Sequence, residues 1–240
     1  MQVYLGEYPG SRSHSDKKFL RAVQSFIDQD DKDSELIIVS DGCEIAHRLY
    51  YKHFKSNNRI KYVYVDKDTP NMYEGEQKYY RGLPRQIGRS LVTGEITTYM
   101  DSDDFLLPTS VTILKNNWQI ALNLKEPKFW CTTTSWIDNK VSVKMHTNNQ
   151  KIEIIGAPFN VEGLNSKWIS IKMKQGWVQS ATWSISHVSN ANSKWEDCVG
   201  GDGKSEDQVF ANKLYEESEE GFIIVDPYYV RCHYSNLWDY

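Results

Sequence analysis

The feature that most constrains the fold is an uninterrupted aliphatic run that ends on an aspartate and a glycine. Residues 36–39 read Leu-Ile-Ile-Val with no polar alternation, and Ser40-Asp41-Gly42 follows. A strand that is apolar at every position has to be covered on both faces, which is typical of a parallel sheet in an α/β protein. A second strand-like run, residues 95–100, is followed directly by Asp101. In such sheets ligands bind beyond the carboxyl ends of the strands, so both aspartates stand where a nucleotide is expected.

Strand and helix patterns alternate around these two runs. Apolar residues at helical spacing predict helices over residues 19–27, 44–54, 84–92, 109–122 and 206–217, and β-rich runs predict strands over residues 3–5, 36–41, 60–65, 95–100 and 222–225. This alternation favours βαβ units. We therefore predict an α/β fold, with an open, twisted, Rossmann-like sheet that carries helices on both faces.

Length and composition favour one folded domain over residues 1–240. Hydrophobic residues make up 40% and charged residues 25%, which is ordinary for a globular protein. The net charge of -4 gives no general attraction for phosphate backbones. The sequence shows no secretory leader and no apolar run long enough for a membrane span, so we expect a cytoplasmic protein. Its four cysteines include no Cys-x-x-Cys pair, so reduced thiols are expected.

An acidic run follows the strand-like residues 95–100. Asp101, Asp103 and Asp104 place three carboxylates within four positions, in an Asp-x-Asp pattern. These charges repel one another unless a cation or hydrogen-bond donors compensate, and a hard divalent ion is the simplest compensation. The alternative is a solvated turn that caps the next helix.

The order of these motifs resembles the large inverting glycosyltransferase family two, which has the GT-A fold. The resemblance spans nearly the whole chain and is strongest over residues 36–107. It rests on an ordered set: the strand with its Asp-Gly turn, then Arg85-Gln86-Ile87-Gly88, Gly94-Glu95, Asp101-Ser102-Asp103-Asp104, and Glu206-Asp207. Each of these pieces is common by itself, whereas their order and approximate spacing are specific.

The resemblance implies a donor site built from both aspartate-bearing strands. Asp41 would recognise the nucleobase with the help of Arg85, and Asp101 would lie near the ribose. Asp103 would bind a Mg²⁺ or Mn²⁺ ion that bridges the diphosphate, with Asp104 supporting the metal. The chemical need is clear, because bond breaking leaves negative charge on the departing nucleoside diphosphate.

The resemblance also implies a base and a further ligand. Asp207 would take the proton of the acceptor hydroxyl, with Glu206 beside it in the donor site, and His233 would contact the metal or the diphosphate. The alternatives are an acidic first helical turn that complements the helix dipole and a structural histidine. His187, in a strand-like run, is expected to be packed or hydrogen-bonded and not catalytic.

The implied function is transfer of one sugar from a UDP-linked donor to an acceptor hydroxyl. About residues 1–108 would bind the nucleotide sugar, and about residues 109–240 would form the acceptor half and the tail. The acceptor stays open among a glycan, a lipid-linked sugar, a protein and a modified DNA base; no strong basic patch favours nucleic acid. Two other functions remain as alternatives: a sugar-phosphate nucleotidyltransferase and a non-catalytic carbohydrate-binding relative.

Overall fold

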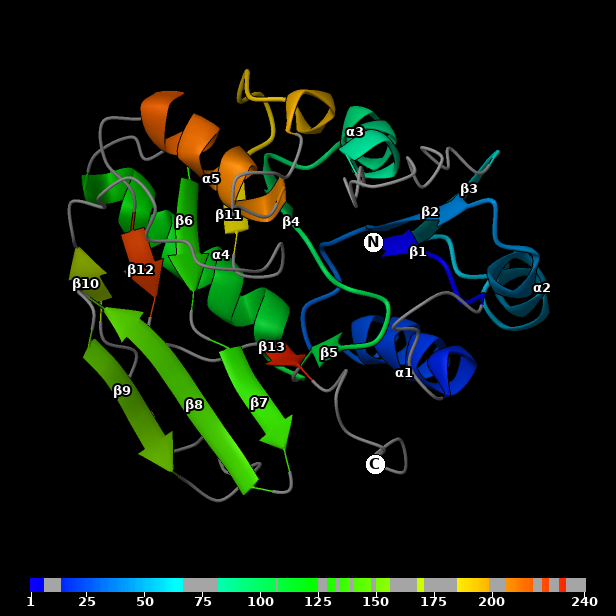
Figure 1. The fold of residues 1–240 in the computed structure, drawn as a ribbon, viewed down its shortest axis with the longest axis horizontal. Coiled ribbons are helices and arrows are strands. Elements are labelled where there is room, and N and C mark those ends of the chain that lie inside the picture. Colours follow the sequence, from blue (N-terminus) through cyan, green and yellow to red (C-terminus); the bar gives the residue numbers. More distant parts are fainter. Residues whose placement is uncertain are drawn as a thin grey trace, which may run out of the picture.

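The computed structural model describes thirteen stretches of the chain: residues 1–6, 14–66, 82–106, 108–124, 129–132, 134–138, 140–147, 150–155, 168–170, 185–198, 206–217, 222–224 and 229–231. These stretches contain three sheets and the helices that cover them (Figure 1).

The first sheet is parallel, as the sequence predicts. Its order is β1-β2-β3, formed by β1 (Gln2–Val3), β2 (Leu36–Asp41) and β3 (Ile60–Val65). The crossover between β1 and β2 contains α1 (Ser15–Ile27), the crossover between β2 and β3 contains α2 (Glu44–His53), and α3 (Gly82–Ser90) comes later in the chain. Parallel neighbours need such long crossovers, which explains the alternation of patterns in the sequence.

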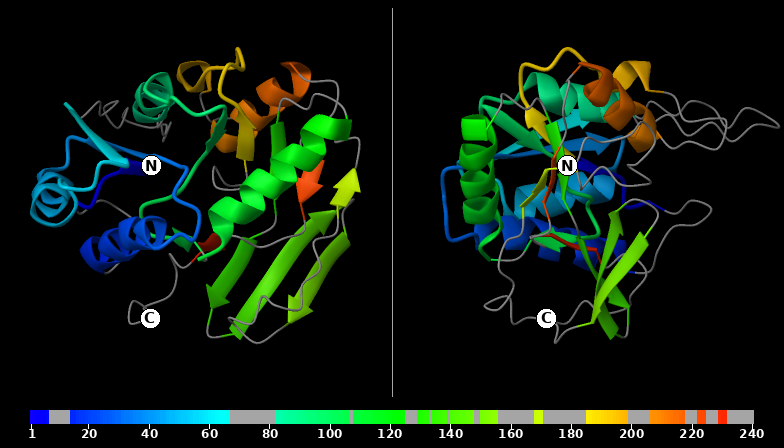
Figure 2. Two further views of the ribbon diagram at one scale, coloured as in Figure 1. Left: turned by 180° about the vertical axis from the view of Figure 1, so that it is seen from behind. Right: turned by 90° about the vertical axis from the view of Figure 1, so that its left-hand side faces the viewer.

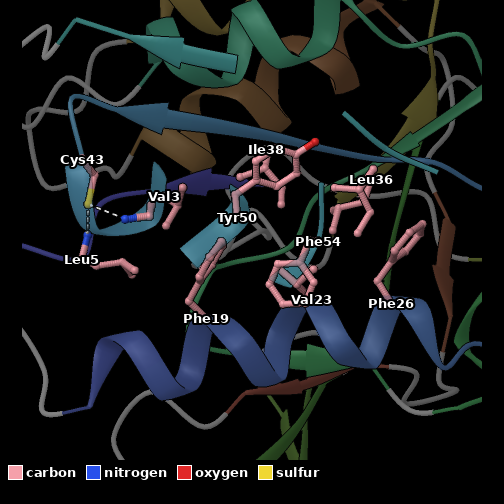
Figure 3. Close-up of a cluster of buried hydrophobic side chains, with 12 residues drawn as sticks. Val3, Leu5, Phe19, Val23, Phe26, Leu36, Ile38, Cys43, Tyr50 and Phe54 are labelled. Carbon is pink, nitrogen blue, oxygen red and sulfur yellow. Dashed lines mark hydrogen bonds between the residues drawn. The ribbon is translucent and has the colours of Figure 1, made fainter. Parts of the chain in front are cut away.

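Strand β2 is buried on both faces because its alternate side chains meet different helices. Leu36 and Ile38 belong to a core cluster with Phe19 of α1 and Tyr50 of α2 (Figure 3). On the other face, a Cβ placed on Gly88 of α3 would lie 3.2 Å from the Val39 side chain, so α3 packs closely there. Helix α3 lies across the sheet from α1 (Figure 2). The prediction of helices on both faces is confirmed.

The loop between β2 and α2 is fixed by two residues of unusual role. Gly42 has φ 61°, a left-handed conformation that glycine adopts without strain, and its N–H donates to the Val65 carbonyl at 2.8 Å. Cys43 is the N-cap of α2, and its Sγ accepts hydrogen bonds from the N–H groups of Ala46 at 3.5 Å and Leu5 at 3.2 Å (Figure 3). The strand therefore ends at Asp41, as predicted.

Strand β4 (Ile96–Thr98) lies where the sequence predicts a strand, but it is not part of the parallel sheet. It pairs antiparallel with β11 (Ile185–Val188) at the edge of a mixed sheet of order β10-β12-β6-β11-β4. The other members are β10 (Trp168–Ser170), β12 (Phe222–Ile224) and β6 (Phe129–Thr132). Its partner comes from far along the chain, and local periodicity carries no information on such a pairing.

The third sheet has the order β5-β13-β7-β8-β9, formed by β5 (Phe105–Leu106), β13 (Tyr229–Arg231), β7 (Thr134–Asp138), β8 (Lys140–Thr147) and β9 (Gln150–Ile155). Helix α4 (Ser110–Leu124), the short 3₁₀ helix η3 (Trp195–Asp197) and α5 (Glu206–Glu217) complete the described elements. Within the described stretches, no helix has the length and apolar character that crossing a membrane requires.

Candidate active site

The acidic run folds into a compact cluster. Asp101, Asp103 and Asp104 lie between β4 and β5, and one carboxylate oxygen from each lies within 4.8 Å of the others. Asp104 is fully buried, and the other two are half-buried. Arg21 of α1 donates from Nη2 to the Asp103 carbonyl at 3.1 Å, so a helix of the first sheet fixes the backbone of this turn.

The donor set of this cluster fits a hard divalent cation. All three groups offer carboxylate oxygens, the ligands that Mg²⁺ and Mn²⁺ prefer. The three carboxylate oxygens lie within 4.8 Å of one another, near enough to be drawn together around one ion. Asp101, Asp103 and Asp104 therefore form a candidate metal site, as the run in the sequence suggests.

A second acidic group lies in the first turn of α5 and is paired with α3. Nη1 of Arg85 lies 3.1 Å from Oδ1 of Asp207 and 3.4 Å from Oε1 of Glu206. The three side chains are only 9 to 14% exposed. Because water screens such partly buried charges weakly, the charge of Arg85 acts strongly on both carboxylates.

Electrostatics connect this pair to the acidic cluster. Burial by itself would lower the pKa of Arg85, but the negative charges of Asp207, Asp101 and Glu206 outweigh it and raise the pKa. Arg85 is therefore always charged. Its guanidinium acts on the candidate metal site and on the candidate base at the same time.

The structure also contains a cavity of about 640 Å³ that Arg85 and Asp101 help to line. Its wall includes Val39 of β2, Trp118 of α4, and Tyr99, which directly follows β4. This volume is in the range of small-molecule sites, and its wall combines apolar side chains with a few charged ones, as such sites usually do.

The two other predicted site residues are Asp41, which belongs neither to the acidic cluster nor to the cavity wall, and His233. Asp41 is half-buried at the end of β2 and is not among the described residues that form the acidic cluster or line the cavity. Its contact with a nucleobase stays a prediction. His233 lies outside the described residues, so its role as a ligand stays a prediction as well.

Sequence reasoning missed the residues that hold Arg85. The guanidinium lies 4.8 Å from the ring centre of Trp195, and the Trp195 N–H donates to Oε1 of Gln86 at 3.0 Å. Arg89 donates to the carbonyls of Ala191 and Ser193. A signal was present in the sequence, because Arg85 and Arg89 are four residues apart and so share one face of α3.

Comparison with known proteins reveals the fold but no family. No protein-family model matches the sequence, and no curated protein matches it. The solved structures of S. aureus TarS do match. TarS 1-349 in complex with UDP has a TM-score of 0.62 at 14% identity, over 96% of this chain and 58% of that chain. TarS 1-349 in complex with UDP-GlcNAc is 15% identical, over 91% of this chain and 55% of that chain.

These matches define the class of the fold. The chain has the Rossmann-like α/β fold of the GT-A glycosyltransferases, to which TarS belongs, as the sequence predicted. A third match, S. aureus TarS, has a TM-score of 0.59 at 13% identity, over 96% of this chain and 35% of that chain. The chain therefore spans little more than half of the shorter TarS chains and about a third of the longer one.

Proposed function

We propose that this chain is an inverting, metal-dependent glycosyltransferase that moves one sugar from a UDP-linked donor to an acceptor hydroxyl. The observation that carries the proposal is the position of Arg85, whose charge acts on Asp207 at 3.1 Å and on Asp101 of the acidic cluster. A candidate base and a candidate metal site thus share one cation. The fold supports the proposal, because TarS has been solved with UDP and with UDP-GlcNAc.

The acidic cluster serves the leaving group. Asp101, Asp103 and Asp104 would hold a Mg²⁺ or Mn²⁺ ion, with His233 as a further ligand. The bound ion would supply Lewis-acid stabilisation of the charge that builds up on the diphosphate. Asp101 would also lie near the ribose, and Asp41 would contact the nucleobase.

Asp207 serves the acceptor. Its carboxylate takes the proton of the acceptor hydroxyl while the oxygen of that hydroxyl bonds to the anomeric carbon of the sugar. The bond from that carbon to the diphosphate oxygen breaks at the same time, and the nucleoside diphosphate leaves with the bonding electrons. A single displacement of this kind inverts the anomeric configuration. Arg85 keeps the carboxylate in place through its contact at 3.1 Å, and Glu206, which contacts the same guanidinium, lies beside it on the donor side.

The acceptor is a glycan or another hydroxyl-bearing molecule in this proposal. A nucleic-acid acceptor stays open but is not favoured by the net charge of -4. The cytoplasmic location also remains a prediction from the sequence.

The test is a screen of nucleotide sugars, beginning with UDP-GlcNAc, for hydrolysis in the presence and absence of Mn²⁺. A glycosyltransferase releases nucleoside diphosphate even without its acceptor, because water can take the acceptor's place. Release of pyrophosphate from a sugar phosphate and a nucleoside triphosphate would instead identify a nucleotidyltransferase. Binding of sugars without metal-dependent nucleotide binding would identify a non-catalytic relative.

The metal site has a matched test of its own. Asp103→Ala removes one ligand and is expected to weaken UDP binding in Mn²⁺ by more than about tenfold, or about 1.4 kcal/mol. Asp28→Ala is the control, because it removes an exposed carboxylate at the C-cap of α1 that is not part of the acidic cluster. Equal UDP affinity with and without Mn²⁺ in the wild type would refute the metal assignment.

A further inference from the structure

A buried hydrogen-bond chain begins two residues before the acidic cluster. The Tyr99 hydroxyl lies 2.8 Å from Nε2 of His187, and the indole N–H of Trp195 donates to the same hydroxyl at 2.8 Å. His187 and Trp195 are fully buried and Tyr99 is nearly so. We call these three residues the Tyr99 network.

Each hydrogen bond of the Tyr99 network has a defined donor and acceptor. Nδ1 of His187 lies 2.7 Å from the Val188 carbonyl, which can only accept, so Nδ1 carries the proton. Burial lowers the pKa of His187 to about 4, so the ring is neutral at neutral pH and Nε2 accepts. The Tyr99 hydroxyl therefore donates to His187 and accepts from Trp195. The chain has a single direction, which fixes the orientation of the Trp195 ring.

The orientation of the Trp195 ring in turn determines where the Arg85 guanidinium packs. Phe210 stacks on the indole with a centroid distance of 3.9 Å, and the Arg85 guanidinium lies 4.8 Å from the centre of the same ring. The backbone is held as well, because a Cβ on Gly82 would lie only 2.3 Å from the Trp195 carbonyl oxygen. Helix α3 therefore contacts Trp195 at both its backbone and its ring.

A purely structural core would not need these polar groups. Tyr99, His187 and Trp195 lie among apolar residues such as Ile185 and Leu214, where each unmet hydrogen bond costs stability. Phenylalanine or leucine would fill the same space without that cost. Buried polar networks instead fix one arrangement of the groups around them when every member is satisfied.

We propose that Tyr99, His187 and Trp195 are positioning residues that set the place of Asp207 relative to the acidic cluster, by way of Arg85. Tyr99 fixes the chain two residues before Asp101, and Trp195 fixes the cation that pairs with Asp207. The Tyr99 network thereby connects the donor end of the site to the acceptor end. This inference rests on the proposed function, in which Asp207 is the base.

The test uses two substitutions that remove the same hydrogen bond from opposite sides. Tyr99→Phe removes the hydroxyl, and Trp195→Phe removes the indole N–H but keeps an aromatic ring beside Arg85. Each is expected to lower kcat roughly tenfold or more and to leave the donor KM little changed, because misplacement of a reacting group slows the chemical step. Since both remove one shared bond, the double variant should lose much less than the product of the two effects.

Tyr64→Phe is the matched control. It also removes one tyrosine hydroxyl, which donates an exposed hydrogen bond to Glu44 at 2.8 Å. Its kcat should equal that of the wild type. A loss of thermal stability in Tyr99→Phe and Trp195→Phe with unchanged kcat would overturn the proposal, because a structural role alone predicts that result.

A second measurement separates this inference from the proposed function. In the folded wild type, the Arg85 guanidinium should rotate slowly enough for its N–H groups to give separate NMR signals. These signals are assigned to Arg85 by their disappearance in Arg85→Lys. These signals should merge in Tyr99→Phe and persist in Tyr64→Phe. If no nucleotide sugar is hydrolysed, the proposed function fails while this measurement still decides on the positioning. Separate signals in Tyr99→Phe would overturn the positioning even in an active enzyme.

Discussion

Arg85 and Asp207 are 122 residues apart in the sequence and 3.1 Å apart in the structure. The contact joins α3, which packs on the first sheet, to the first turn of α5. It brings a permanent positive charge to the carboxylate that we propose as the base. The two side chains are 9% and 14% exposed, so solvent weakens their attraction little.

Loss of Arg85 should therefore destabilise the fold. Arg85→Gln removes the guanidinium that contacts both Glu206 and Asp207, and the free energy of unfolding is expected to fall by about 3 kcal/mol. Arg85→Lys keeps the charge but not the planar fork that can serve two carboxylates and lie over a ring, so it should recover only part of the loss. Urea unfolding measures all three proteins.

The control for this prediction is an exposed ion pair at a similar distance. Nζ of Lys194 lies 3.4 Å from Oε1 of Glu196, but these side chains are 56% and 42% exposed. Lys194→Gln should change the free energy of unfolding by less than about 1 kcal/mol. If Arg85→Gln costs no more than Lys194→Gln, the pair with Asp207 does not form as described.

Gly82 should tolerate no side chain, because α3 touches Trp195 there. Gly82→Ala would place a Cβ 2.3 Å from the Trp195 carbonyl oxygen, so the helix or η3 has to shift, and we expect a loss of about 1 to 3 kcal/mol. At Gly94 the nearest atom to a new Cβ is 3.7 Å away, an ordinary contact. Gly94→Ala is the matched control, and thermal unfolding of both variants compares them. Equal melting temperatures would contradict the close packing.

The sequence predicted the elements of the first sheet well because their signals are local. The aliphatic run of β2 needs cover on both faces, and both covers exist: Phe19 and Tyr50 on one side and α3 on the other. The sequence could not reveal that β4 pairs antiparallel with β11, whose residues come some ninety positions later. Strand pairing depends on distant partners, and no periodicity encodes them.

The candidate site divides in the same way. Asp101, Asp103 and Asp104 are neighbours in the sequence, so their clustering could be predicted. Arg85, by contrast, contacts Asp207 and Trp195, which lie far from it in the sequence. These two contacts could not be predicted from the sequence. The resemblance suggested Arg85 as an aid to nucleobase binding, and the structure adds its pairing with the candidate base. His187 was expected to be packed or hydrogen-bonded, and in the structure it is both.

The buried His187 should make stability depend on pH. Burial is the main cause that lowers its pKa from 6.5 to about 4, with a smaller effect from Arg89, and the Val188 carbonyl and Glu217 act in the opposite direction. Between these two values the unfolded chain binds the proton and the folded chain does not. The free energy of unfolding therefore falls as pH falls through this range, by about 3 kcal/mol in total.

His187→Gln isolates this contribution. The variant has no ring to titrate, so its free energy of unfolding should fall less than that of the wild type between pH 7 and pH 4. Urea unfolding at several pH values gives the difference between the two curves, in which all other titrating groups cancel. Parallel curves would mean that His187 titrates alike in the folded and unfolded states.

The assignment of Asp207 as the base leads to a prediction about both rate and stereochemistry. Asp207→Asn keeps the shape of the side chain but removes its basicity, so turnover should fall by roughly 10² or more while UDP affinity changes little. Glu206→Gln is the matched variant, because Glu206 pairs with the same arginine at 3.4 Å and should matter less for turnover. A greater loss in Glu206→Gln would move the base to that residue, and an equal loss of UDP affinity in Asp207→Asn would point to a role in donor binding.

The stereochemical part needs no substitution. One base and one displacement give a product of inverted anomeric configuration, so NMR of the first sugar released by the wild type should show inversion, and retention would contradict the mechanism even if Asp207 proved essential.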